Sequence, residues 1–166
     1  HNCLVGSEMC IRDSANSVSE VVFTRNTTHS INQIAKGMKW EKGDVIITGD
    51  REHNSNLVPW LQLAEERGIE HRIIESNTDN TFNVEKFEQL CEDVGDRLKM
   101  VALSQVGNLD GIAIPIKKIA QITHQYDGLI AVDGAQSTPH MRVDVQDLDI
   151  DFISFSIHKM CGPSGM

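Results

Sequence analysis

The residues around Lys159 have the clearest chemical potential in the sequence. Ser156 and His158 come just before this lysine, and residues 162–165 (Gly-Pro-Ser-Gly) predict a turn after it. An amine that can reach an aldehyde forms a Schiff base with it, and neighbouring groups can lower the pKa of the amine and anchor a phosphate. We therefore expect Lys159 to bond to an aldehyde cofactor, with Ser156 and His158 holding the phosphate of that cofactor.

Asp133 supplies the second chemical element of this region. It follows the apolar residues 129–132, which predict a buried parallel strand, so its carboxylate should emerge where open α/β sheets bind ligands. A carboxylate there keeps a pyridinium nitrogen protonated, which makes the ring an electron sink. Lys159 and Asp133 together thus indicate a site for pyridoxal 5'-phosphate. Taken singly, a lysine is usually a solvated charge and an aspartate after a strand is usually a helix cap, so order and spacing carry the prediction.

Three short motifs carry a resemblance to a known family. They are residues 133–136 (Asp-Gly-Ala-Gln), 156–159 (Ser-Ile-His-Lys) and 162–165 (Gly-Pro-Ser-Gly). They resemble the signature of class V aminotransferase-type pyridoxal-phosphate enzymes, most closely the cysteine desulfurase and selenocysteine lyase branch, and the resemblance covers the chain from about residue 21 onward. It implies these roles: Schiff-base formation by Lys159, pairing of Asp133 with the pyridine nitrogen, donation by Gln136 to the ring hydroxyl, and phosphate binding by Ser156 and His158.

Residues 25–28 (Arg-Asn-Thr-Thr) resemble the Arg-Gly-Thr-Thr of the same family. Apolar residues at helical spacing between positions 31 and 38 predict a helix, which places Thr27 and Thr28 at or near its N-terminus. Free N–H groups and the helix dipole favour phosphate there, so both threonines are expected to bind the cofactor. Without the family, a plain threonine N-cap is the commoner interpretation. Asn26 replaces the family's glycine, and asparagine tolerates a left-handed backbone better than most residues.

Two further stretches match the family at the ends of predicted strands. Residues 52–60 (Glu-His-Asn-Ser-Asn-Leu-Val-Pro-Trp) resemble the desulfurase branch, which implies that His53 stacks on the cofactor ring and takes part in proton transfer. An imidazole suits that role because it titrates near neutral pH, although a loop histidine taken alone is more often a surface residue. Asn108 matches the family position that contacts the ring oxygen of the cofactor.

Strands alternate with helices along the chain, which predicts an α/β fold: a three-layer sandwich with a mostly parallel sheet and right-handed crossovers. This is the large domain that the resemblance to pyridoxal-phosphate-dependent transferases implies. We expect five segments, which end near Thr28, His53, Asn108, Asp133 and Lys159, to gather at one end of the sheet. The acidic residues 144–151 are expected to be a solvated connection, since they lack the glycine and distal glutamate of an EF-hand loop. Predicted strands are 21–24, 45–48, 69–74, 98–103, 129–132 and 152–154, and predicted helices are 31–38, 57–64, 84–91 and 116–126.

Composition narrows the class of protein. The 166 residues are 40% hydrophobic, which is ordinary for a globular domain, and the net charge of −9 argues against nucleic acid as a partner. No apolar run is long enough for a membrane span, and no signal peptide is apparent, so we expect no membrane association. The four cysteines lack the spacing of a metal site or a disulfide framework, so we expect no metal and a cytoplasmic location.

The resemblance also implies a division of the chain. We expect residues 1–16 to be non-native or disordered and residues 17–166 to be a pyridoxal-phosphate-binding large domain that ends before the C-terminal small domain. Members of the family are about twice as long by this resemblance, so the chain is expected to be a fragment. The catalytic cysteine would then lie beyond the end of the chain. Cys161 is close to Lys159, but a buried or inert cysteine is the commoner case.

The function implied by the resemblance is that of a cysteine desulfurase. Such an enzyme removes sulfur from L-cysteine to give alanine and an enzyme persulfide, which serves iron-sulfur cluster assembly or other sulfur delivery. It implies a homodimer and a possible sulfur-acceptor protein, with Lys159 and His53 as the catalytic residues. Two alternatives stay open: another class V enzyme of the aminotransferase, epimerase or kynureninase type, and a non-catalytic fragment.

Overall fold

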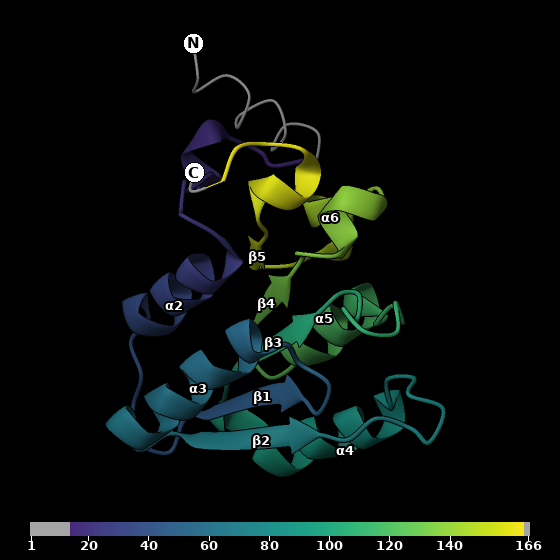
Figure 1. Cartoon of the computed structure of the whole chain (residues 1–166). Helices are drawn as coiled ribbons and strands as arrows, with labels where there is room; N and C mark the ends of the chain where they lie inside the picture. Colours follow the sequence, from purple (N-terminus) through teal and green to yellow (C-terminus); the bar gives the residue numbers. More distant parts are fainter. Residues whose placement is uncertain (1–13, 165–166) are drawn as a thin grey trace.

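The computed structural model describes residues 14–164 and contains a five-stranded sheet in the order β2-β1-β3-β4-β5 (Figure 1). Each neighbouring pair of strands is parallel, which confirms the predicted α/β class. β3 lies at the centre of the sheet. The predicted non-native segment, residues 1–16, lies largely outside the described residues. The strands are β1 (Val45–Gly49), β2 (Glu70–Ile74), β3 (Leu98–Ser104), β4 (Leu129–Asp133) and β5 (Phe152–Ser154).

Helices connect the strands and cover both faces of the sheet (Figure 1). Every residue of β1 is buried and so is nearly every residue of β3, which is why these strands read as continuous apolar runs and not as alternating patterns. None of the helices in the described range is long and apolar enough to cross a membrane. The helices are α2 (Thr27–Gly37), α3 (Asn54–Arg67), α4 (Val84–Val94), α5 (Ile116–His124), α6 (Ser137–His140) and α7 (Val145–Leu148), with the 3-10 turns η1 (Val18–Glu20), η2 (Gly95–Arg97) and η3 (Ile157–Met160).

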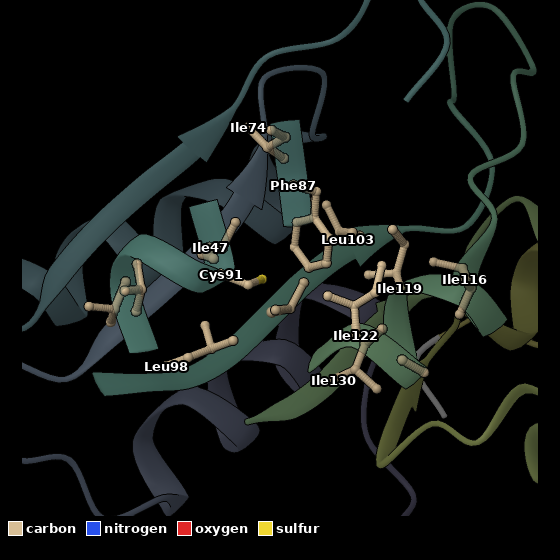
Figure 2. Close-up of a cluster of buried hydrophobic side chains, with 14 of the residues drawn as sticks. Ile47, Ile74, Phe87, Cys91, Leu98, Leu103, Ile116, Ile119, Ile122 and Ile130 are labelled. Atoms are coloured by element: carbon tan, nitrogen blue, oxygen red, sulfur yellow. The ribbon is translucent and has the colours of Figure 1, made fainter. Parts of the chain in front are cut away.

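Two hydrophobic cores make the three layers. One core packs α4 and α5 against the sheet, and Figure 2 shows Ile47, Phe87, Leu103 and Ile119 within it. Cys91 is also fully buried there, and desolvation raises the pKa of its thiol to about 12. The core on the opposite face joins α2 and α3 to the sheet through side chains that include Ile31, Ile46, Trp60, Met100 and Ala131.

The chain before α2 differs from the prediction. Residues 21–24 were expected to form a strand, but they have no ladder partner among the described residues. Val22 and Phe23 are 74% and 50% exposed. An apolar, β-branched run therefore fails to become a strand here, because a strand also needs a neighbouring backbone to pair with.

The start of α2 also differs in detail. Asn26 is its N-cap, and the Asn26 side chain accepts a hydrogen bond from the N–H of His29 at 2.9 Å. The backbone of Asn26 is extended, with φ −174°, so the expected left-handed conformation is wrong. The cap is thus an asparagine, not a threonine, which leaves the side chain of Thr27 free for another contact. In the acidic segment, Asp144 similarly caps a short helical turn, α7, by accepting from the N–H of Asp147.

Candidate functional site

The carboxyl ends of β3, β4 and β5 form the floor of the candidate site. Ser104, Asp133 and Ser154 are register partners across these strands, so the three polar strand ends lie in one row. Backbone bonds continue the row past the strands: the N–H of Gln105 donates to the Asp133 carbonyl at 3.0 Å, and the N–H of Gly134 donates to the Ser154 carbonyl at 2.8 Å. This edge is where open parallel sheets bind their ligands.

Asp133 is the buried charge of this edge, with 5% of its surface exposed. Its Oδ1 accepts a hydrogen bond from the N–H of Ala135 at 2.9 Å. Burial raises the pKa of the carboxyl, while the Ala135 bond, the charges of Lys159 and His53 and the Ser55 side chain act to lower it. The two expected catalytic residues therefore lie close enough to Asp133 to act on its charge, although they come from segments far apart in the sequence.

His53 is held by its place at the start of α3. It is the N-cap residue, and its Nδ1 accepts a hydrogen bond from the N–H of Ser55 at 3.1 Å. The Ser55 hydroxyl lies 2.6 Å from the same nitrogen. Because Nδ1 is an acceptor here, a neutral His53 ring carries its proton on Nε2. The side chain is exposed, which leaves the Nε2 edge accessible.

Thr27 and Ser156 meet at the N-terminus of α2. The N–H of Thr27 donates to Ser156 Oγ at 2.9 Å, and the two side-chain oxygens are 2.7 Å apart. Both residues are buried. A second pair of hydroxyls, those of Ser30 and Ser154, lies 2.8 Å apart and ties the same helix to β5. Two hydroxyls at a helix N-terminus form a favourable place for a phosphate, because hydroxyls can donate to phosphate oxygens and the helix dipole favours negative charge there.

Lys159 lies in the 3-10 turn η3, and its side chain is exposed. The turn closes tightly behind it: Cys161 has a left-handed backbone with φ 62°, and the N–H of Gly162 donates to the Ile157 carbonyl at 3.0 Å. A Cβ on Gly162 would lie 2.0 Å from Ile157 Cγ2, so this turn requires glycine. η3 contacts α6 at the end of the sheet (Figure 1, yellow segment).

Other predicted site residues are placed less tightly. Thr28, Asn108 and His158 are exposed, and Gln136 is partly buried just before α6. Within residues 14–164, no hydrogen bond or ion pair joins any of these four side chains to Asp133. The structure therefore brings together Asp133, Lys159 and His53, and separately Thr27 and Ser156, while the roles of the other four stay predictions.

Known proteins match the sequence of this chain over nearly its whole length. The sequence model of the family described as aminotransferase class-V matches residues 13–166. The chain belongs to that family. A probable cysteine desulfurase of Halalkalibacterium halodurans is 40% identical over 155 residues, which are 92% of this chain and 37% of that protein. A cysteine desulfurase of Haloferax volcanii is 41% identical over 150 residues, or 89% of this chain and 34% of the relative.

Solved structures of the same family agree. The cysteine desulfurase CsdA of Escherichia coli superposes with a TM-score of 0.89 at 34% identity and covers 98% of this chain and 41% of its own. The cysteine desulfurase of Thermococcus onnurineus gives a TM-score of 0.88 at 32% identity, covering 97% and 40%. The resemblance to the class V family and its desulfurase branch is confirmed. This chain spans less than half the length of each of these relatives.

Sequence reasoning on the class V motifs missed two residues of the site. Glu52 accepts bonds from the backbone and side chain of Ser104, and its role had no expectation attached to it. Ser55 contacts the His53 ring and likewise had no expected role. Both lie inside the quoted motif at residues 52–60, so the available signal was their adjacency to His53.

Proposed function

We propose that the protein is a pyridoxal-phosphate-dependent cysteine desulfurase that acts on L-cysteine. The observation that carries the proposal is the convergence of Lys159 and His53 on the buried carboxylate of Asp133. That convergence occurs in a chain that is about 40% identical to cysteine desulfurases. The products would be alanine and a persulfide on a cysteine of the enzyme, which would pass its sulfur to an acceptor.

The residues present fit pyridoxal phosphate in charge and shape. Asp133 offers a buried carboxylate whose raised pKa reflects an unfavourable, desolvated charge, and a cationic ring N–H would relieve that cost. Thr27 and Ser156 offer hydroxyls at the N-terminus of an eleven-residue helix, which suits a phosphate dianion. Lys159 offers an exposed amine three residues after Ser156 in the chain. When bound, the cofactor supplies an electron sink for a carbanion at the substrate.

The side chains of this chain then have distinct tasks. Lys159 would hold the cofactor covalently and, as a free amine, would carry a proton to or from the substrate carbon. His53 has Nδ1 occupied by Ser55, so Nε2 is the atom that holds or gives a proton. Asp133 keeps its negative charge opposite the ring nitrogen. Thr28, Asn108, Gln136 and His158 are proposed as further cofactor contacts on the strength of the family motifs.

The first test is a titration with pyridoxal phosphate, followed by borohydride reduction and peptide mapping. We expect the label on Lys159, its loss in K159A, and its retention in K39A, which removes an exposed lysine elsewhere. Label spread over surface lysines, with none concentrated on Lys159, would contradict the cofactor site. For the activity, a protein that carries the remaining length of its relatives should release sulfide and alanine from cysteine. Amino-group transfer or pyruvate formation without sulfide would instead indicate another class V enzyme.

We further propose a homodimer that works in the cytoplasm with a sulfur-acceptor protein, and the resemblance to the desulfurase branch supports this proposal. The absence of a disulfide-type cysteine pattern in the sequence agrees with a reducing compartment. Light scattering during size-exclusion chromatography measures the mass of the assembly. A monomeric mass for a protein of full family length would refute the dimer.

A further inference from the structure

Glu52 is a half-buried acid that precedes His53 and joins the β1–α3 loop to the end of β3 at the centre of the sheet. The N–H of Ser104 lies 3.0 Å from each of its two carboxylate oxygens, and the Ser104 hydroxyl donates to Oε2 at 2.6 Å. The Asn56 amide also donates to Oε2, at 2.7 Å. These contacts connect two segments that are 52 positions apart in the chain. Through these hydrogen bonds, Glu52 attaches the β1–α3 loop to the end of β3.

Asn56, which also contacts Glu52, is itself held by burial and by a hydrogen bond. Asn56 is 1% exposed and Trp60 is 0% exposed, and the Trp60 indole N–H donates to Asn56 Oδ1 at 3.2 Å. Glu52, Asn56 and Trp60 are spaced four residues apart, so they follow one face of the helix start into the core. The Glu52 contact is therefore continuous with buried, well-packed residues of α3.

We infer that Glu52 is a positioning residue that sets the place of His53 opposite Asp133 by fixing the β1–α3 loop to Ser104. Ser104 is the register partner of Asp133, so the strand position that holds Glu52 lies directly beside the strand position that presents the carboxylate. His53 follows Glu52 in the chain and acts on the charge of Asp133. One path of covalent and hydrogen bonds thus links the imidazole to the carboxylate it faces.

The contact between Glu52 and Ser104 should depend on the protonation of Glu52. Desolvation raises the pKa of Glu52 to about 7, the charge of Asp133 adds to that rise, and the bonds from Ser104 and Asn56 oppose it. All the contacting groups donate, so the ionised carboxylate makes the full set of bonds, and protonation weakens them. Asp133 is the charged group that faces Glu52 from β4, while Asp50 and Arg51 flank it on its own loop.

The inference deepens the proposed function, because it assumes that His53 acts on the bound cofactor. Its first test needs no cofactor. The Trp60 indole is bonded to Asn56, which in turn contacts Glu52, so its fluorescence is sensitive to this contact. The sequence has two tryptophans, and W40F leaves Trp60 as the one that emits. We expect Trp60 emission to change through a transition at about pH 7. E52Q should abolish this transition and S104A should shift it. E66Q, which changes an exposed glutamate of α3, should leave it unchanged.

A second test asks whether Glu52 acts through His53. In the otherwise unchanged chain, E52Q should weaken pyridoxal-phosphate binding about tenfold, as judged by the absorbance of the bound cofactor. In an H53A background the same change should cost less than about twofold, because the residue being positioned is gone. Equal losses in both backgrounds, or an unaltered Trp60 transition in E52Q, would overturn the inference. If no variant binds cofactor, the proposed function fails, and the Trp60 transition still decides the role of Glu52.

Discussion

Replacing Glu52 with glutamine should change how the stability of the chain depends on pH. Burial raises the pKa of Glu52 from 4.5 to about 7 in the folded state. A carboxyl with a raised pKa binds its proton more tightly in the folded chain than in the unfolded chain. Its contribution to stability is therefore fully present below pH 4.5 and is lost as the pH rises to about 7. Glutamine does not titrate, so the variant lacks this contribution to the slope.

The size of the effect follows from the same shift. One unit of pKa corresponds to about 1.4 kcal/mol, so a change from 4.5 to about 7 corresponds to at most about 3 kcal/mol of unfolding free energy. The Glu52 side chain is partly exposed, and solvent screening reduces this upper value. We expect wild type to lose up to that amount, relative to E52Q, between about pH 4.5 and pH 8.

Urea unfolding followed by circular dichroism, at about pH 5 and about pH 8, measures the difference directly. E66Q should follow wild type at both pH values, because Glu66 is exposed on α3. The reasoning is refuted if E52Q and wild type differ by the same free energy at both pH values. That result would mean that Glu52 keeps an ordinary pKa despite its desolvation.

Three further predictions test the core, the edge of the sheet and the lysine turn. Phe87→Ala should cost about 3 to 5 kcal/mol in urea unfolding because Phe87 is 0% exposed, whereas Phe23→Ala, at a 50% exposed position, should cost under about 1 kcal/mol. Desolvation lowers the pKa of His124, but contacts with two aspartates outweigh it, so the pKa is raised in the folded chain. The stabilising effect of protonated His124 is therefore present below about pH 6.5 and lost as the pH rises through the folded pKa. His124→Gln should remove that dependence, by under about 1 kcal/mol in thermal unfolding at two pH values, and an unchanged dependence would contradict it. Gly162→Ala should abolish specific borohydride labelling of the lysine turn while global stability changes little, and adding Ile157→Ala should restore it, because the new Cβ would otherwise lie 2.0 Å from Ile157 Cγ2.

The sequence by itself determined the layers of the fold. Residues 45–47, 100–103 and 129–132 are continuous apolar runs within the predicted strands, and strands buried on both faces have this pattern because helices cover both sides. Helical spacing located the helices between them, since the period of the side chains is a local property of the chain. The motifs at residues 133–136, 156–159 and 162–165 carried the resemblance to the class V family, which the comparisons confirmed.

The tertiary structure alone decided which residues meet. Residues 21–24 have strand-like composition, but no neighbouring backbone pairs with them in the described chain, and a ladder partner is a non-local property. Ser156 reaches Thr27 across 129 positions, and Glu52 reaches Ser104 across 52, because sheet register brings distant strand ends together. The raised pKa of Glu52 has the same origin: desolvation depends on what packs around a side chain, and no local sequence pattern specifies it.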